Sequence, residues 1–303
     1  MTETTPVPGF EATSFTHRGE TRRVFLAGTG PAVVVVHETP GLHPGVIAFG
    51  QRLVDTGFTV YLPSLFGRPG GPVTTGAVIR SLGRVCVARE FTLLADRTSP
   101  VTHWLRALAV QAQVDCGGPG VGAVGMCITG GFALAMAVES AVLAPVLSQP
   151  GLPLGWTAAK HAALGLDPQD LTRVRERTRD GLCVLGLRFS NDKSSPAERF
   201  ATLRRTLGEA FEGIEIDSSP GNPYGIPARA HSVLAFDFVD EPGHPTRAAL
   251  DRVLSFLHER LHTYLTQDRP PSFRGRSVSV AGCVCQPCCT VRGIASREAL
   301  VCS

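Results

Sequence analysis

Apolar residues occur along the chain in short continuous runs and in longer segments with helical spacing. Together these patterns predict strands that alternate with helices. The run at 32–36, Ala-Val-Val-Val-Val, is short, β-branched and free of polar residues, which is typical of a strand buried on both faces of a parallel sheet. Residues 44–56 carry apolar side chains at helical spacing, and Gly57 is a typical helix stop. A second apolar run follows at 58–62. This strand–helix–strand order predicts a parallel sheet with a right-handed crossover.

The same alternation continues through most of the chain. Further strands are expected at 23–27, 121–126, 141–147, 182–187 and 214–216, and further helices at 100–114, 131–140, 196–207 and 246–264. Residues 73–95 are ambiguous, and 149–180 form a polar, proline-containing stretch that is expected to be helical in part. We therefore expect one α/β domain over 1–267. Residues 268–303 are rich in Arg, Ser, Pro and Cys and are expected to form a flexible tail.

Composition narrows the classes of function. The chain has 303 residues, 43% of them hydrophobic, which is enough for the core of one large domain. Its formal net charge is +3, and Lys and Arg form no concentrated block, so nucleic acid is not an expected partner. Residues 1–16 are polar and do not resemble a secretory signal, so a cytoplasmic location is expected. The nine cysteines are then expected to be thiols rather than disulfides.

Residues 116–138 contain no charged side chain, and this length is sufficient to span a bilayer. The stretch is however broken by glycines, a proline and a threonine. A buried strand, a tight turn and a buried helix in series would give the same absence of charge, because strands of parallel sheets are themselves continuous apolar runs. We therefore expect no membrane association.

The most informative motif is Gly-Met-Cys-Ile-Thr-Gly-Gly at 125–131, which joins an apolar strand to an apolar helix. A nucleophile at such a junction needs small neighbours, because the backbone bends sharply and the side chain must stand clear. The amides and the dipole at the start of the helix can stabilise a thiolate and an oxyanion. The structural alternative is that Cys127 is simply a buried cysteine, since free cysteines are often buried.

This motif resembles the G-x-C-x-G-G turn of dienelactone hydrolases, in which cysteine takes the place of the usual serine. Thr129 stands where the first later glycine of that turn is expected. The resemblance extends over residues 33–261. It implies an α/β-hydrolase fold, with a doubly wound, mostly parallel sheet of about seven or eight strands and helices on both faces. It also implies hydrolysis of an ester or lactone through a cysteine acyl-enzyme, with no metal or organic cofactor.

In this fold the acid and the histidine follow the nucleophile in that order. Asp192, in Ser-Asn-Asp-Lys-Ser-Ser-Pro, resembles the acid loop of the family, and His231, in Ala-His-Ser-Val-Leu, resembles its catalytic histidine loop. Asp192 could otherwise be a turn residue and His231 a surface histidine. His244 is the nearest rival, but Pro-Gly-His-Pro is more typical of a turn that starts a helix.

Glu38, after the first buried strand, resembles the family's glutamate, which contacts the nucleophilic cysteine and takes part in its activation. The alternative is a loop carboxylate that faces water. The resemblance further implies that the backbone N–H groups of Thr39 and Ile128 form the oxyanion hole. Arg68 stands where the family has an arginine that holds the substrate carboxylate, a task that suits its planar guanidinium. The family's second such arginine is replaced by Ala235, which argues against dienelactone itself as substrate.

Two other motifs suggest different chemistry. Residues 120–125 match G-x-G-x-x-G, but they lie on a predicted strand rather than after one, so a dinucleotide site is not favoured. A Cys-x-Cys-x-x-Cys-Cys cluster in the tail could bind zinc, although four ligands within seven positions make a cramped site. Its members are Cys283, Cys285, Cys288 and Cys289. Cys86, Cys116 and Cys183, which precede the tail and lie outside the motif, are expected to be thiols in or near the core.

Several functions remain open on this fold. A thioesterase or a general carboxylesterase would need the same residues, and a catalytically inactive hydrolase could serve as a binding protein. The presence of all four residues, Cys127, Asp192, His231 and Glu38, argues against the inactive form. Residues 149–180 lie between nucleophile and acid, where a lid over the site is a hypothesis. The expected partner is a small-molecule ester or lactone, and the sequence does not fix the oligomeric state.

Overall fold

The computed structural model describes residues 6–87, 99–151 and 161–262. These residues belong to one compact unit, Met1–Leu265. The second unit, Thr266–Ser303, lies outside the described residues, and so do the tail predicted at 268–303 and its cysteine cluster. The prediction of a separate tail therefore stays a prediction.

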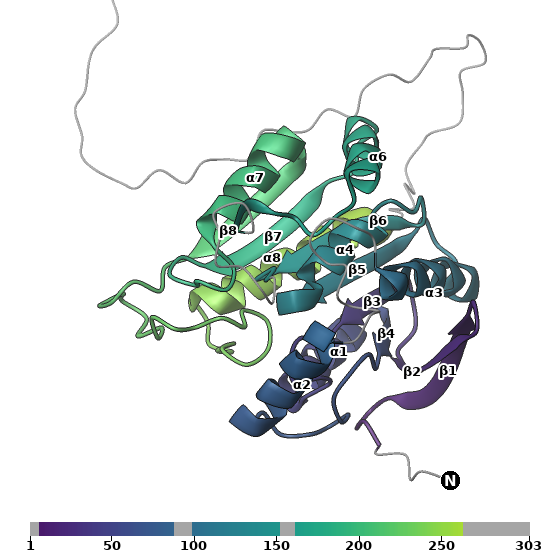
Figure 1. Ribbon diagram of the computed structural model, residues 1–303, viewed down its shortest axis with the longest axis horizontal. Helices are drawn as coiled ribbons and strands as arrows, with labels where there is room; N and C mark the ends of the chain where they lie inside the picture. Colours follow the sequence, from purple (N-terminus) through teal and green to yellow (C-terminus); the bar gives the residue numbers. More distant parts are fainter. Residues whose placement is uncertain (1–5, 88–98, 152–160, 263–303) are drawn as a thin grey trace, which may run out of the picture. The chain divides into compact units, whose positions relative to one another are not determined.

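The described part of the chain contains one eight-stranded sheet with the order β1-β2-β4-β3-β5-β6-β7-β8 (Figure 1). The strands are β1 (Glu11–His17), β2 (Glu20–Ala27), β3 (Ala32–Val36), β4 (Thr59–Pro63), β5 (Val121–Met126), β6 (Val142–Ser148), β7 (Val184–Phe189) and β8 (Phe211–Ile216). Strands β1 and β2 are antiparallel to their neighbours, and all other pairs are parallel. The strand order reverses at β3, which has β4 on one side and β5 on the other. Ligands of such sheets bind beyond the carboxyl ends of the strands near that point.

Helices cover both faces of this sheet. One core cluster joins the sheet to α1 (Pro44–Asp55) and α8 (Pro245–Leu261). The other cluster joins it to α3 (Pro100–Cys116), α4 (Gly130–Met136), α6 (Pro168–Arg179) and α7 (Ala197–Leu207). Further helices of the described residues are α2 (Thr75–Val87) and the 3₁₀ turns η1 (Cys127–Thr129) and η2 (Gly208–Ala210). The doubly wound, mostly parallel α/β architecture predicted from the sequence is confirmed.

Strand β1 and the end of α4 are among the differences from the prediction. Strand β1 was not predicted, because its residues are mostly polar and exposed and it is held by antiparallel pairing with β2 rather than by burial. The helix predicted at 131–140 ends at Met136. The guanidinium of Arg177 in α6 holds the chain that follows this end. It donates hydrogen bonds to four carbonyl oxygens beyond α4, those of Ala137 (2.5 Å), Glu139 (2.5 Å), Ser140 (3.3 Å) and Val142 (2.9 Å).

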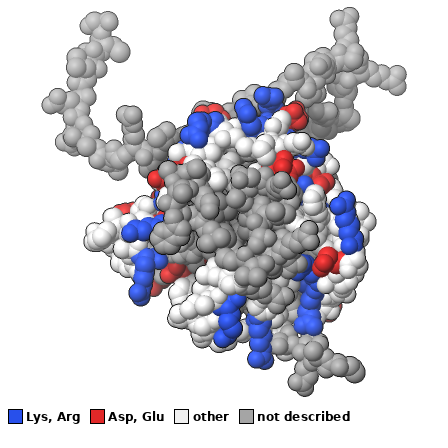
Figure 2. Space-filling model, in the orientation of Figure 1, with Lys and Arg blue, Asp and Glu red and all other residues white. Residues whose placement is uncertain are grey.

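The charge-free stretch at 116–138 forms the end of α3, then β5, η1 and α4. Among the residues that the structure describes, no helix combines the length and the apolar character needed to cross a bilayer. On the face shown in Figure 2, basic and acidic side chains are interspersed over much of the described surface.

Strand β8 forms one open edge of the sheet, and its outward carboxylates are held in ion pairs. Glu212 accepts two hydrogen bonds of 2.7 Å from Arg252. Glu215 pairs with Arg188 and with Arg204, the latter at 2.6 Å. The edge strand therefore carries paired charge on both faces of the sheet, Glu212 toward α8 and Glu215 toward α7.

Candidate active site

Cys127 directly follows β5, and its backbone has the geometry of a nucleophile turn. Its φ of 55° lies in the left-handed region, which few residues other than glycine adopt. The turn leaves no room for a side chain at Gly125, where a Cβ would lie 2.3 Å from the carbonyl oxygen of Thr129. A Cβ at Gly130 would lie 2.7 Å from the Cα of Pro150. Small residues are thus required on both sides, and they leave the Cys127 side chain partly accessible.

Thr129, the residue that departs from the family motif, is buried and ties the turn together. Its hydroxyl accepts a hydrogen bond of 2.9 Å from the amide of Met126. The hydroxyl proton faces the carbonyl oxygens of Val36 and Met126, each at 2.8 Å. Threonine fits this position because its hydroxyl links the turn of Cys127 to the end of β3.

His231 and Asp192, predicted as base and acid, lie in contact. The His231 Nδ1 is 2.6 Å from the Asp192 Oδ2, and the buried carboxylate also accepts a hydrogen bond of 2.8 Å from the amide of Ser194 through its Oδ1. With Nδ1 facing the carboxylate, Nε2 is the ring nitrogen left for the thiol. Burial lowers the pKa of His231. The charge of Cys127 and the hydrogen bonds with Asp192 and Cys127 outweigh burial and raise this pKa well above its ordinary value of 6.5.

The loop that carries His231 is fixed through its backbone. The carboxylate of Asp237 accepts hydrogen bonds of 2.9 Å from the amides of His231 and Ser232. The rival histidine, His244, is the N-cap of α8, where its Nδ1 accepts a hydrogen bond from the amide of Thr246 at 3.3 Å. His244 thus starts a helix, as its sequence context predicted.

Glu38 follows β3 and is buried, with only 3% of its surface exposed, so it is not a loop carboxylate facing water. Its Oε1 accepts hydrogen bonds from the Nε2 of His43 (3.0 Å) and the hydroxyl of Ser232 (2.6 Å). Its Oε2 accepts one from the Nε2 of Gln149 (2.8 Å). Within the described part of the chain, Cys127 is not among its hydrogen-bond partners. The contact with Cys127 that the family resemblance implies therefore stays a prediction.

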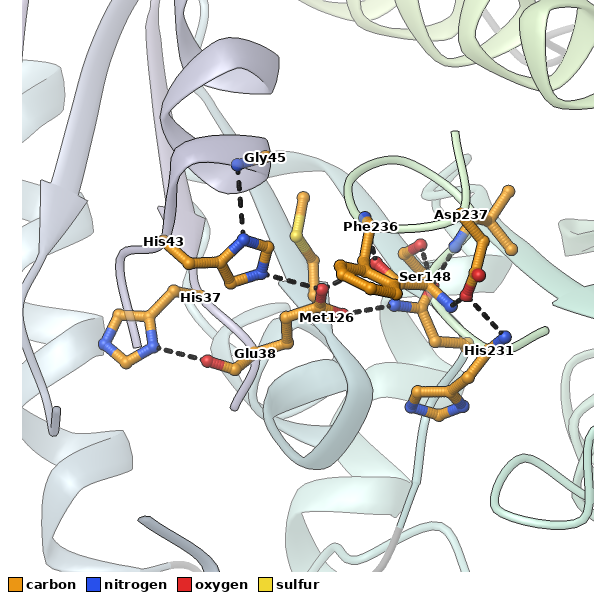
Figure 3. A network of polar contacts seen from close by, with 12 residues as sticks. His37, Glu38, His43, Gly45, Met126, Ser148, His231, Phe236 and Asp237 are labelled. Carbon is orange, nitrogen blue, oxygen red and sulfur yellow. Dashed lines mark hydrogen bonds and ion pairs between the residues drawn. The ribbon is translucent and has the colours of Figure 1, made fainter. Parts of the chain in front are cut away.

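Figure 3 shows this network, with the ring of His43 turned toward the Glu38 carboxylate and the loop of His231 and Asp237 on the other side. His37 joins this network through hydrogen bonds to backbone atoms. Its Nδ1 donates to the Glu38 carbonyl oxygen (3.0 Å), and its Nε2 accepts from the amide of Leu65 (3.1 Å). Burial lowers the pKa of His37 to about 4, so the ring stays neutral and links the loops after β3 and β4.

The predicted oxyanion donors lie at the ends of β3 and β5. The N–H of Thr39 donates no hydrogen bond within the ranges that the structure describes. Ile128 follows the nucleophile in the first turn of the helical segment, where backbone N–H groups have no intrahelical partner. Gly151 packs beside the turn and donates from its amide to the Cys127 carbonyl oxygen at 2.8 Å. The amides of Thr39 and Ile128 thus lie beyond the carboxyl ends of the neighbouring strands β3 and β5.

Arg68 is exposed and lines a cavity of about 470 Å³ between the loops after β3 and β4 and helix α2. Pro40 and His43 line the same cavity, so it begins directly beside Thr39. Arg80 of α2 is a second arginine in the lining, and it was not singled out from the sequence. None of the described residues that line this cavity is a carboxylate, which suits an anionic group.

The other motifs are structural where they are described. The glycines at 120–125 lie in and just before β5, and a Cβ at Gly122 would lie 2.8 Å from Leu257 of α8. They serve close packing of a strand rather than a phosphate loop. Helix α6, within the proposed lid at 149–180, is a crossover helix between β6 and β7, with Asp170 paired to Arg106 of α3 at 2.6 Å. Residues 152–160 are not described, so the lid stays a hypothesis. No cluster of metal-ligating side chains occurs in the described segments.

Solved structures with this fold include several dienelactone hydrolases. A protein from Klebsiella pneumoniae subsp. pneumoniae MGH 78578, assigned as a dienelactone hydrolase, is 19% identical, with a TM-score of 0.56 over 82% of this chain and 98% of its own. The dienelactone hydrolase from Anabaena variabilis ATCC 29413 is 16% identical, with a TM-score of 0.53 over 84% and 98%. A dienelactone hydrolase-like promiscuous phosphotriesterase from metagenomic libraries is 17% identical, with a TM-score of 0.52 over 84% and 98%.

At these identities the structural likeness shows the fold alone. No curated protein matches the sequence. The family model of the dienelactone hydrolase family, however, matches residues 24–259, which is most of the chain and includes the motif of Cys127, the acid loop and the histidine loop. The chain therefore belongs to the dienelactone hydrolase family of carboxylic ester hydrolases.

Proposed function

We propose that this chain hydrolyses an ester or lactone of a small molecule through an acyl-enzyme on Cys127. The observation that carries the proposal is the position of Cys127 at a strained strand-to-helix turn, in electrostatic contact with a histidine that is itself bonded to a buried aspartate. A nucleophile, a base and a group that orients the base are the three parts that nucleophilic catalysis requires.

In the first half-reaction the proton of the Cys127 thiol moves to Nε2 of His231, and the thiolate attacks the carbonyl carbon. The carbonyl electron pair moves onto oxygen, where the amides of Thr39 and Ile128 donate hydrogen bonds to it. When the C=O bond re-forms, the C–O bond to the alkoxide breaks, and this leaving group takes the proton from His231. A thioester with Cys127 remains. Since a thiolate also leaves easily, reactive esters and lactones suit this site better than amides.

In the second half-reaction His231 removes a proton from water, and the resulting hydroxide attacks the thioester carbonyl. The C–S bond breaks, the carboxylic acid leaves, and the Cys127 sulfur recovers a proton from His231. Asp192 keeps the ring oriented throughout. Glu38 was predicted to share in activating the thiol. Because hydrogen bonds occupy both of its oxygens, the proposal assigns the proton to His231 alone.

Arg68 is proposed to hold an anionic group of the substrate in the cavity beside Thr39. The Arg68→Met variant should raise KM for an ester that carries a carboxylate by about 10-fold, since a charge-assisted hydrogen bond contributes about 1.5–3 kcal/mol. KM for the neutral methyl ester of the same compound should stay unchanged. Equal KM changes for both compounds would remove Arg68 from the site.

The central experiment compares hydrolysis of p-nitrophenyl acetate by wild type and by the Cys127→Ala variant, with intact-mass detection of the acyl-enzyme. Loss of the nucleophile should lower kcat by at least about 10³-fold and abolish the adduct. The Cys183→Ala variant is the matched control, because Cys183 is a partly buried thiol away from the site. Equal rates in wild type and Cys127→Ala would refute the proposal. A panel of lactones, esters and thioesters then distinguishes a lactonase from a general carboxylesterase or thioesterase.

A further inference from the structure

Gln149, directly after β6, has an unusual position for a glutamine. Its side chain is fully buried, and its φ of 36° lies in the left-handed region. Its backbone amide donates to the Leu187 carbonyl oxygen at 2.6 Å, which continues the pairing of β6 with β7. Strained backbone of this kind costs about 1–3 kcal/mol and is retained where the surrounding structure requires it. The requirement here lies in the contacts of the side chain.

The amide group of Gln149 connects two loops that come from distant parts of the sequence. Its Nε2 donates to the Oε2 of Glu38, in the loop after β3, at 2.8 Å. Its Oε1 accepts from the amide of Val233, two residues after His231, at 3.2 Å. The hydroxyl of Ser148 also donates to this Oε1. One side chain thus links the loop of Thr39 to the loop of the base.

The other partners of Glu38 are also hydrogen-bond donors. The Nδ1 of His43 accepts from the amide of Gly45 (3.2 Å), so its Nε2 carries the proton and donates to Glu38. The hydroxyl of Ser232 accepts from the amide of Phe236 (2.8 Å), and its proton points to Glu38. Three donors from three segments therefore converge on one carboxylate, and no acceptor faces it in the described structure.

We propose that Gln149 is a positioning residue for the reaction. It fixes Glu38 as an acceptor between the two loops, so that the Thr39 amide and the His231 ring keep their places relative to Cys127. In this arrangement the Glu38 carboxylate joins the loop after β3 to the loop of His231 and does not exchange a proton with the thiol. The inference rests on the proposed role of Cys127 and His231, and it adds a residue that the catalytic turn and its histidine loop do not contain.

The test uses the Gln149→Met variant of the full chain, because methionine has similar length and removes all three hydrogen bonds of the side chain. A displacement of about 1 Å at reacting groups costs about 100-fold in rate, so kcat should fall by about 10- to 100-fold. KM should change by less than about threefold, since Gln149 does not line the cavity of Arg68. The matched control is Gln111→Met, an exposed glutamine of α3 that bonds Asp115; it should leave kcat unchanged.

A second readout needs no substrate. The rate at which iodoacetamide alkylates Cys127, followed by peptide mass spectrometry, reports the thiolate formed with His231. This rate should fall at neutral pH in Gln149→Met and also in Ser232→Ala, which removes the other link from Glu38 to the histidine loop. The Gln149→Glu variant should be at least as impaired as Gln149→Met, because it sets a second carboxylate against Glu38.

The inference is overturned if Gln149→Met, folded as judged by circular dichroism and thermal unfolding, keeps both kcat and the alkylation rate within about twofold of wild type. If Gln149→Met does not fold, the same comparison for Ser232→Ala decides. Wild type without esterase activity would contradict the proposed function alone, since the alkylation rates would still test whether Gln149 positions the pair of Cys127 and His231.

Discussion

The tightest steric requirement at the site is at Gly125, and a single methyl group should test it. In the Gly125→Ala variant the new Cβ would lie 2.3 Å from the Thr129 carbonyl oxygen and 3.0 Å from the Cα of Gly130. Both are backbone atoms, so no side chain can rotate away. Ordinary contact begins at 3.4 Å, so the turn must open by about 1 Å. We expect a loss of about 1–3 kcal/mol in the free energy of unfolding from overpacking, and a fall in kcat of about 100-fold as Cys127 is displaced.

Urea unfolding followed by circular dichroism measures the first quantity, and p-nitrophenyl acetate hydrolysis measures the second. The matched control is Gly83→Ala in α2, where a Cβ meets nothing within 4 Å. This change should stabilise the fold by up to about 1 kcal/mol, because alanine is the better helix former. If Gly125→Ala unfolds at the wild-type urea concentration and retains its kcat within about twofold, the steric reasoning about the turn is refuted.

Three further predictions concern charge and buried hydrogen bonds. Asp192→Asn should lower the pKa of His231, as measured by NMR titration of its ring nitrogens. In the wild type the raised pKa stabilises the fold fully below about pH 6.5, and this stabilisation is lost as the pH rises through the pKa of the folded state. The free energy of unfolding of the variant should therefore fall less over that rise in pH. Asp170→Ala should cost about 3–5 kcal/mol in urea unfolding by leaving Arg106 buried without its carboxylate, and a cost below 1 kcal/mol would show that the pair is dispensable. Thr129→Val should cost about 1–3 kcal/mol in thermal unfolding, since a buried amide loses its acceptor, whereas an unchanged midpoint would contradict this.

The central sheet could be predicted from the sequence, because strands buried on both faces, such as 32–36 and 121–126, are continuous apolar runs. The strands at the two edges of the sheet could not be predicted in this way. Strand β1 carries mostly polar, exposed residues, and the first half of β2 is also polar, so their hydrogen-bonded partners, rather than their own hydrophobicity, define them. Strand β8 is longer than the predicted 214–216, because Phe211, Glu212 and Gly213 extend it by pairing with β7.

The candidate site likewise contains residues that the sequence could predict and residues that it could not. Cys127, Asp192 and His231 each stand in a local sequence pattern, and the fold places all three where strands β5, β7 and β8 are followed by loops. Gln149 and His43 have no such pattern, since a glutamine after a strand or a histidine in a loop is common anywhere. Their contacts with Glu38 form only in the folded sheet, where the end of β6 lies one strand away from the end of β3.

The charged edge of the sheet has a consequence for how the protein behaves at high concentration. An edge strand presents unpaired backbone N–H and C=O groups to which another chain can add, which is a common start of aggregation. On β8, Glu212 and Glu215 stand beside these groups, held by Arg188, Arg204 and Arg252. A strand approaching this edge would have to strip water from four accessible charged groups, those of Glu212, Glu215, Arg204 and Arg252, before gaining a single backbone hydrogen bond. The ion pairs that fasten β8 to its neighbours thus also keep the open edge of the sheet from recruiting other copies.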